Sequence, residues 1–221
     1  MYNPTFQMPP VVKNLIIINV IMLLATLVFK DVMYEYLGLF YPASPFFKPY
    51  QFVTHMFMHG GFLHLFFNMY TLWIFGTALE YVWGSKRFFT FYIITGLGAA
   101  AIHMLVMWID ASSLQNAIAA GDVFARSAYH DLLRTPTVGA SGAIYGVLLG
   151  YGMLFPNNVL RLIFPPIALK AKWFVIIFGA LELVLGLSNR GSQIAHFAHL
   201  GGMIFAYFLI VYWRKRGQYR F

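Results

Sequence analysis

Six long apolar runs constrain this chain more than any other feature. They lie at about residues 10–29, 52–79, 88–109, 138–155, 167–187 and 194–213. Each is close to the roughly 20 residues that a helix needs to cross the hydrocarbon core of a bilayer. Backbone hydrogen bonds must be satisfied internally in lipid, and a helix does this within one segment. The runs therefore predict an all-α membrane protein, a bundle of six transmembrane helices in a single domain over residues 1–221.

The composition agrees with this class and excludes several others. Of the 221 residues, 60% are hydrophobic and 10% are charged, whereas a soluble domain carries about 25% charged residues. The absence of cysteine excludes disulfides, thiolate metal sites and cysteine catalysis. The first ten residues lack the basic region of a signal peptide. No segment resembles a nucleic-acid-binding module, so we expect the lipid bilayer and no nucleic acid as a partner.

Basic residues divide unequally between the two sides of the predicted bundle. Six spans put both termini on one side, which holds ten of the fifteen lysines and arginines, Arg220 among them. The other side holds five, namely Lys30, Lys48, Arg126, Arg134 and Arg190. By the positive-inside rule, this distribution predicts that both termini are cytoplasmic.

Two outer loops are long enough to carry structure of their own. The first, residues 31–51, is rich in aromatic residues and proline, a composition that suits the headgroup region of a bilayer. The second, residues 110–136, is polar and rich in alanine, and we expect a short surface helix in it.

Polar residues stand inside the apolar runs, where unpaired polar groups cost several kcal/mol each. They are His64 and Asn68 in the second run, Ser141 in the fourth and His199 in the sixth. These three spans run in the same direction, and at about 1.5 Å per residue the motifs begin roughly 15, 5 and 8 Å past the outer ends of their spans. All of them thus fall in the outer half of the bilayer, which predicts one shared site that opens outward.

Stripes of small residues support the same juxtaposition. They recur every four residues in the fourth and sixth runs, as Gly142, Gly146 and Gly150 and as Ala198, Gly202 and Ala206. Such stripes let membrane helices approach closely. Since Ser141 borders the first stripe and His199 the second, pairing the stripes would bring the hydroxyl and the imidazole together.

A serine that faces a histidine is the minimum set for a hydroxyl nucleophile and its base. Ser141, at the start of a helix, also has free backbone N–H groups beside it. Tyr145, one turn further along, is placed to stack on the imidazole of His199. Glu182 is expected to lie deeper, at the middle of its span, where it would clasp a neighbouring helix. The residues therefore predict a dyad rather than a triad.

His64 and Asn68 share one face of their helix because they are four residues apart. Their side chains supply the donors that an oxyanion needs, although a plain helix–helix clasp is the alternative. His55, His59 and His64 do not form the His-Glu-x-x-His pattern of a metal site, and no carboxylate accompanies them. We therefore expect neither a metal nor another cofactor.

Three motifs in this order resemble the rhomboid intramembrane serine proteases. They read HGGFLHLFFN at 59–68, GASGAIYG at 139–146 and AHLGG at 198–202. The resemblance implies a six-helix rhomboid bundle with an interfacial first outer loop. It also implies a catalytic dyad of Ser141 and His199 and an oxyanion site that includes His64 and Asn68. Supporting positions in the motifs are Tyr145, His59, Gly139, Gly142 and Gly202.

The function that the resemblance implies is hydrolysis of single-span membrane proteins near the outer membrane face. One departure concerns the first loop, where Tyr50-Gln51 stands in place of the family's usual Trp-Arg pair. That arginine often contacts a glutamate at the end of the second span, and Glu80 is present here. The substitution puts this loop-anchoring contact in doubt but leaves the chemistry in place.

Two other functions are compatible with such an architecture. One is a non-proteolytic protein that binds spanning helices, against which the intact dyad counts. The other is a transporter, which is expected to show broken helices in paired halves, and no such repeat is found. Because no targeting sequence is recognised, we expect a bacterial plasma membrane; the sequence does not define an oligomeric state.

Overall fold

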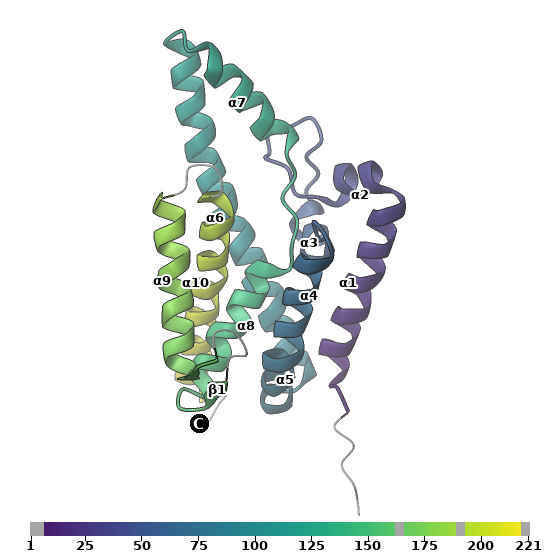
Figure 1. The fold of residues 1–221 in the computed structure, drawn as a ribbon, viewed down its shortest axis with the longest axis vertical. Helices are drawn as coiled ribbons and strands as arrows, with labels where there is room; N and C mark the ends of the chain where they lie inside the picture. Colours follow the sequence, from purple (N-terminus) through teal and green to yellow (C-terminus); the bar gives the residue numbers. More distant parts are fainter. Residues whose placement is uncertain (1–6, 162–165, 189–192, 218–221) are drawn as a thin grey trace, which may run out of the picture.

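The computed structural model describes residues 7–161, 166–188 and 193–217, and these form a bundle of helices (Figure 1). Arg190 and Arg220, which entered the charge comparison, lie outside the described residues. The helices are α1 (Pro10–Val28), α2 (Lys30–Leu37), α3 (Gln51–Thr54), η1 (His55–Phe57), α4 (Phe62–Thr71), η2 (Leu72–Gly76, a π-helical turn), α5 (Thr77–Trp83), α6 (Ser85–Ala119), α7 (Val123–Arg134), α8 (Ser141–Leu154), α9 (Ala171–Ser188) and α10 (Gln193–Lys215).

Five helical segments of the described chain are long and apolar enough to cross a membrane: α1, the continuous stretch Phe62–Trp83, α6, α9 and α10. The fourth apolar run forms α8, which has only 14 residues, or about 21 Å against a hydrocarbon core of about 30 Å. The prediction of an all-helical membrane bundle is confirmed, whereas the count of six spans is not. The beginning of α1 and the end of α10 lie at the same end of the bundle (Figure 1).

The second predicted span, 52–79, is wrong at its start. Its first residues form the short helices α3 and η1, and the long helix begins only at Phe62 and continues to Trp83. The break coincides with Gly60 and Gly61, and consecutive glycines disfavour a helix interior. His64 consequently lies in the first turn of its helix, about 3 Å from its start, rather than 15 Å deep.

The third span, predicted at 88–109, extends much further, because α6 has 35 residues. At about 1.5 Å per residue, α6 measures about 52 Å and is longer than a bilayer core. Its far end is followed by α7, which runs back across the same end of the bundle (Figure 1). Asp122 caps α7 by accepting hydrogen bonds from the backbone of Phe124 and Ala125. The predicted surface helix is therefore confirmed.

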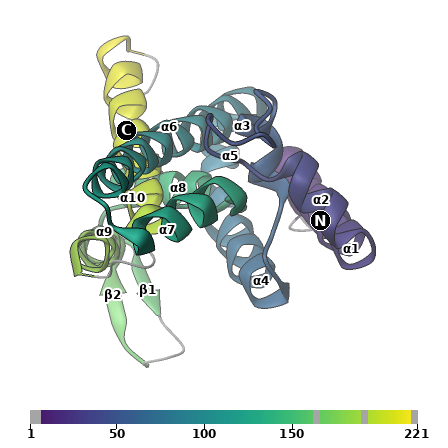
Figure 2. The ribbon, with the colours of Figure 1, turned by 90° about the horizontal axis from the view of Figure 1, so that it is seen from above.

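Helix α8 lies inside the bundle, in contact with α4, α5, α6, α9 and α10 (Figure 2). Its glycines allow this position, since a Cβ atom at Gly142 would overlap with the methyl group of Ala99, and one at Gly146 with Thr95. Gly142 and Gly146 thus lie close to α6, and Gly142 also meets the stripe on α10, at Gly202 and at the carbonyl oxygen of Ala198. The predicted pairing of the two stripes is confirmed at Gly142 and Gly202.

The fifth run departs from the prediction at its start. Residues 168–170 form strand β2 (Ala168–Lys170), which pairs antiparallel with β1 (Val159–Arg161). Leu160 and Leu169 are partners in this hairpin, and both pack against the apolar cluster around Leu148 and Phe174. Burial of one face explains why this apolar segment is a strand before α9 begins.

The first loop is anchored by Gln51 itself. This side chain is fully buried, and its amide oxygen accepts hydrogen bonds from the backbone N–H groups of Lys48 at 3.0 Å and Phe40 at 3.4 Å. Its amide nitrogen donates to the carbonyl of Phe46 at 3.0 Å, and to two further carbonyls of the loop. The loop thus has an anchor without the usual arginine.

Glu80 has a different partner. Its carboxylate accepts hydrogen bonds from the backbone N–H groups of Val11 at 3.0 Å and Val12 at 2.8 Å, and from the Ser85 hydroxyl at 2.7 Å. The first N–H groups of a helix have no partner within it, and an anion there also complements the helix dipole. Glu80 therefore fixes α1 to the end of α5.

Candidate active site

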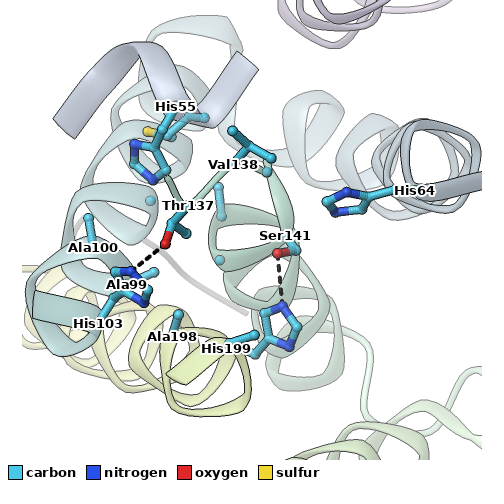
Figure 3. A pocket seen from close by; sticks show the side chains of 16 residues that line it. His55, His64, Ala99, Ala100, His103, Thr137, Val138, Ser141, Ala198 and His199 are labelled. Carbon is cyan, nitrogen blue, oxygen red and sulfur yellow. Dashed lines mark hydrogen bonds between the residues drawn. The ribbon is translucent and has the colours of Figure 1, made fainter. Parts of the chain in front are cut away.

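Ser141 and His199 are in direct contact. Nε2 of His199 lies 2.8 Å from Oγ of Ser141, a normal hydrogen-bond distance. Ser141 is the first residue of α8, and His199 stands six residues into α10. The close approach of Gly142 and Gly202 holds these two helix ends together, so the sequence-predicted pair of hydroxyl and imidazole meets in the structure (Figure 3).

The ring of Tyr145 stacks on the imidazole of His199, as predicted. The ring centroids are 4.3 Å apart and the planes differ by 4°. Stacking of this kind restricts rotation of the imidazole and keeps Nε2 directed at the hydroxyl of Ser141. Tyr145 comes from the second turn of α8, so one helix positions both Ser141 and the ring that stacks on His199.

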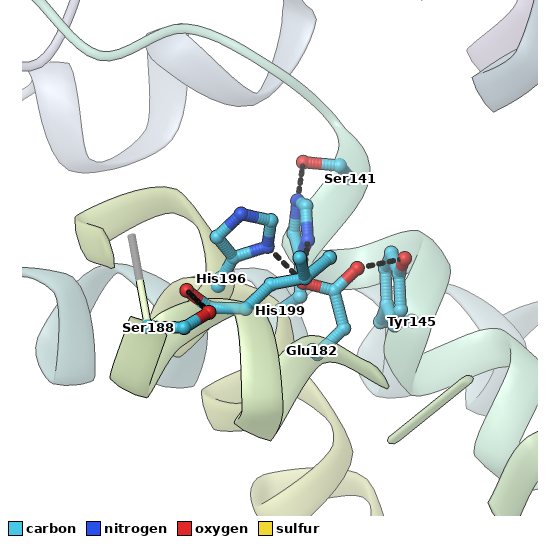
Figure 4. A network of polar contacts seen from close by, with 7 residues as sticks. Ser141, Tyr145, Glu182, Ser188, His196 and His199 are labelled. Atoms are coloured by element: carbon cyan, nitrogen blue, oxygen red, sulfur yellow. Dashed lines mark hydrogen bonds and ion pairs between the residues drawn. The ribbon is translucent and has the colours of Figure 1, made fainter. Parts of the chain in front are cut away.

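Glu182 does not lie deeper than the site, and that prediction is wrong. Its Oε2 atom is 3.1 Å from Nδ1 of His199, the ring nitrogen that faces away from Ser141. This is an ion-pair distance without the alignment of a hydrogen bond, since Nδ1 has no hydrogen-bond partner among the described residues. The same carboxylate accepts hydrogen bonds from the hydroxyl of Tyr145 and, at 2.6 Å, from Nδ1 of His196 (Figure 4).

The position of Glu182 follows from the antiparallel arrangement of α9 and α10. Glu182 is six residues before the end of α9, and His199 is six residues after the start of α10, so each lies about 9 Å from its helix end. Residues equally distant from the connection of two antiparallel helices lie side by side. The equal distance of Glu182 and His199 from the connection was the signal available in the sequence. The prediction placed Glu182 by its distance from the middle of its span and therefore did not detect it.

His64 lies across the same cavity as Ser141 and His199 (Figure 3). The backbone N–H of Gly60 donates to its Nδ1 at 3.3 Å, which places the proton of the neutral ring on Nε2. A Cβ atom at Gly139 would come within 3.2 Å of that Nε2, so the N–H bond of His64 is near the loop before Ser141. Gly139 itself has a φ of 143°, a conformation that favours glycine.

Asn68 is buried, but it does not line the cavity. Its amide nitrogen donates to the carbonyl oxygen of His64 at 3.0 Å, so in this structure it supports its own helix. Its assignment as an oxyanion donor stays a prediction. His59 is fully buried with its ring centroid 5.0 Å from that of His64, which agrees with a supporting position. Burial, aided by the neighbouring His64, lowers the pKa of His59 to about 4.

The cavity has a volume of about 190 Å³ and reaches beyond Ser141 and His199. His55, His103 and Thr137 line its far part, and Nε2 of His103 is 2.6 Å from the hydroxyl of Thr137 (Figure 3). Sequence reasoning did not place His103 or Thr137 at the site. Thr137 directly follows the second loop, and its backbone pairs with that of Leu39 in the first loop through two hydrogen bonds. Because Thr137 lies outside the helices, hydrophobic periodicity does not predict its position.

Within the described part of the chain, one group of side chains has the composition of a metal site. Ligand atoms of Glu182, His196 and His199 lie within 4.8 Å of one another. Ligands about 2.0–2.1 Å from a tetrahedral zinc ion are separated by about 3.3 Å, whereas the carboxylate and His196 are only 2.6 Å apart. This distance fits a hydrogen bond better than two ligands of one ion. The expectation that no metal is needed stays a prediction.

A family model described as the Rhomboid domain matches residues 47–216. The chain belongs to the rhomboid family. Intramembrane serine-type proteolysis is the general activity of rhomboid proteins, and the several apolar helices make this rhomboid a multi-pass membrane protein.

Relatives of this rhomboid occur in fungi, plants and animals. Rhomboid protein 1, mitochondrial, of Saccharomyces cerevisiae is 31% identical over 151 residues, which cover 66% of this chain and 36% of the relative. RHOMBOID-like protein 5 of Arabidopsis thaliana is 28% identical over 170 residues, 77% of this chain and 46% of the relative. Presenilin-associated rhomboid-like protein, mitochondrial, of Homo sapiens is 28% identical over 171 residues, which cover 72% of this chain and 38% of the relative. The chain spans less than half the length of each of these relatives.

Proposed function

We propose that this rhomboid is a serine endopeptidase that hydrolyses peptide bonds of single-span membrane proteins near the α7 end of the bundle. The observation that carries the proposal is the 2.8 Å contact between Oγ of Ser141 and Nε2 of His199 at the start of α8. A hydroxyl paired with an imidazole is the arrangement of a nucleophile and its general base, which acyl transfer requires.

In the proposed reaction, Ser141 attacks the carbonyl carbon of the scissile peptide. His199 takes the hydroxyl proton and returns it to the leaving amine. The negative oxygen of the tetrahedral intermediate is stabilised by the free backbone N–H of Ser141 and by the Nε2–H of His64, with Asn68 as the further predicted donor. Water then hydrolyses the acyl-enzyme. The steps need no cofactor.

The substrate helix enters laterally between α4–α5 and α9. Phe75 of η2 stacks against Phe174 of α9 at a centroid distance of 6.3 Å. This contact joins the two helical segments at the end of α9 away from Glu182, so we expect the substrate to enter nearer to Ser141. Helical backbone resists attack because its carbonyls are hydrogen-bonded. We therefore expect cleavage where glycine, proline or small polar residues make unwinding near the interface easy.

The prediction of a bacterial plasma membrane is not supported, since the yeast and human relatives are named as mitochondrial.

The assignment of the termini to the cytoplasmic side stays a proposal based on the distribution of basic residues. Since the chain contains no cysteine, this orientation can be tested directly with single-cysteine variants. Arg216→Cys, directly after α10, should react with a membrane-impermeant thiol reagent only from the cytoplasmic side, and Asp131→Cys in α7 only from the opposite side. Reaction of both from one side would contradict it.

The first experiment is labelling of the purified protein by a fluorophosphonate probe, compared with Ser141→Ala and His199→Ala. We expect labelling of the wild type and none of either variant. Cleavage of a single-span substrate in liposomes should follow the same order. Absence of both reactions in well-folded wild-type protein would favour the alternative, a rhomboid that binds membrane helices without cutting them.

A further inference from the structure

We infer that Glu182 is a positioning residue for His199, so that a third residue supports the predicted pair of Ser141 and His199. This inference rests on the proposed peptidase function and goes beyond it. Carboxylate, imidazole and hydroxyl lie in one line of contacts, from Oε2 of Glu182 to Nδ1 of His199 at 3.1 Å and from Nε2 of His199 to Oγ of Ser141 at 2.8 Å.

The two nitrogens of His199 have different neighbours, and this decides which of them carries the proton. A carboxylate beside Nδ1 favours the form with the proton on Nδ1, and this form leaves Nε2 free to accept the proton of Ser141. In the opposite tautomer, Nε2–H would point at the hydroxyl and could not act as the base. Glu182 thus selects the productive form of the imidazole.

The carboxylate is itself held in place from two directions. The hydroxyl of Tyr145 on α8 donates to Oε1, and Nδ1–H of His196 on α10 donates to Oε2 at 2.6 Å (Figure 4). Glu182 is only 7% exposed, and a buried carboxylate needs such donors. Tyr145 also stacks on His199, so one side chain fixes both the base and the group that orients it.

Charge gives Glu182 a second effect on the reaction. The imidazolium that forms when His199 accepts the proton has Tyr145, His196 and, across the cavity, His64 as its other titratable neighbours. Among the described residues that line the cavity or join this network, Glu182 is the one acid. It therefore stabilises the imidazolium by a charge interaction at close range.

The test compares Glu182→Gln, which keeps the shape but removes the charge, with Glu182→Asp, which keeps the charge. The kcat and KM for a single-span substrate in liposomes are measured as a function of pH, with thermal unfolding as the check on folding. For Glu182→Gln we expect kcat to fall about 10- to 100-fold and KM to change by less than about twofold. The acidic limb of its kcat–pH profile, where activity falls as His199 is protonated, should move to lower pH because the imidazolium has lost its counter-charge.

Glu182→Asp should keep the acidic limb near its wild-type position, with partial activity. A merely structural clasp between helices would lower the unfolding temperature of both variants without moving this limb. A wild-type kcat and an unmoved limb in folded Glu182→Gln would overturn the inference. If Glu182→Gln does not fold, Glu182→Asp decides the question alone. An acidic limb that moves to lower pH in this variant, as expected for loss of the charge although the charge is kept, would also overturn the inference.

The same preparations separate this inference from the proposed function. An active wild type with inactive Ser141→Ala establishes the peptidase whatever Glu182 does. A folded wild type that neither cleaves nor reacts with fluorophosphonate overturns the peptidase proposal, and the role of Glu182 falls with it.

Discussion

Gly202 of α10 lies against the backbone carbonyl of Gly142 in α8, with no room for a side chain between the two helices. A Cβ atom at Gly202 would overlap with that carbonyl oxygen. Because the obstacle is backbone within a helix, it cannot rotate away as a flexible side chain can. The contact lies beside both Ser141 and His199, so it controls the distance between the two groups.

We expect Gly202→Ala to lower stability by about 1–3 kcal/mol through overpacking and to reduce activity by separating Ser141 from His199. Thermal unfolding in detergent and substrate cleavage measure the two effects. Gly179→Ala is the matched control, since its nearest neighbour would be the end of the flexible Met203 side chain at 3.2 Å. Equal behaviour of the two variants would show that the close approach is not required.

Two substitutions at Tyr145 separate its hydroxyl from its ring. Tyr145→Phe keeps the stack on His199 but loses the hydrogen bond to Glu182, and we expect kcat to fall about three- to tenfold. Tyr145→Ala loses both contacts and frees the imidazole to rotate, so we expect a loss of about 100-fold. Steady-state cleavage assays give both values. If the two variants have the same kcat, stacking does not position the base.

Gln51→Ala should destabilise the first loop. The buried amide serves both donors and acceptors of the loop backbone, and removing it leaves these groups unpaired, for an expected loss of about 2–3 kcal/mol. The control is Gln115→Ala on α6, whose amide makes an exposed hydrogen bond to Tyr129 and should contribute less than about 0.5 kcal/mol. Unfolding temperatures and limited proteolysis within residues 38–50 report the difference. Unchanged protection of the loop in Gln51→Ala would contradict the anchoring role.

Acid should destabilise the protein through two buried histidines outside the long helices. Burial lowers the pKa of His55 and of His59 to about 4, below the value of about 6.5 in an unfolded chain. Between these values the unfolded state binds more protons, so stability falls as the pH falls from about 6.5 towards 4 and is fully present above that window. The expected contribution is on the order of a few kcal/mol, measured as unfolding temperature against pH. His59→Phe should flatten this dependence; a slope equal to that of the wild type would assign it to other groups.

Much of this architecture can be predicted from the sequence because hydropathy is a local property. The apolar runs locate α1, α9 and α10 to within a few residues, and polar residues inside them identify the candidate site before any contact is known. The motif around Ser141 also predicts the stack of Tyr145 on His199, since two residues four apart on one helix share a face.

Other features depend on groups far apart in the chain. Hydropathy did not reveal that α8 is too short to span a membrane by itself, because its surroundings are other helices. It also assigned 168–170 to a helix, although the packing of Leu160 and Leu169 makes that segment a strand. The sequence put a contact between Gln51 and Glu80 in doubt, but it did not show that each side chain binds a different part of the backbone.

The sequence by itself determined the membrane class, the family and the presence of a serine, histidines and an asparagine in the apolar runs, because composition and spacing suffice for these. The tertiary structure decided which polar groups meet. It brought Glu182 to the far side of His199, left Asn68 bound to its own helix, and added His103 and Thr137 to the cavity. Such contacts depend on how helices pack across the bundle, and a distance set by packing is not encoded in any one segment.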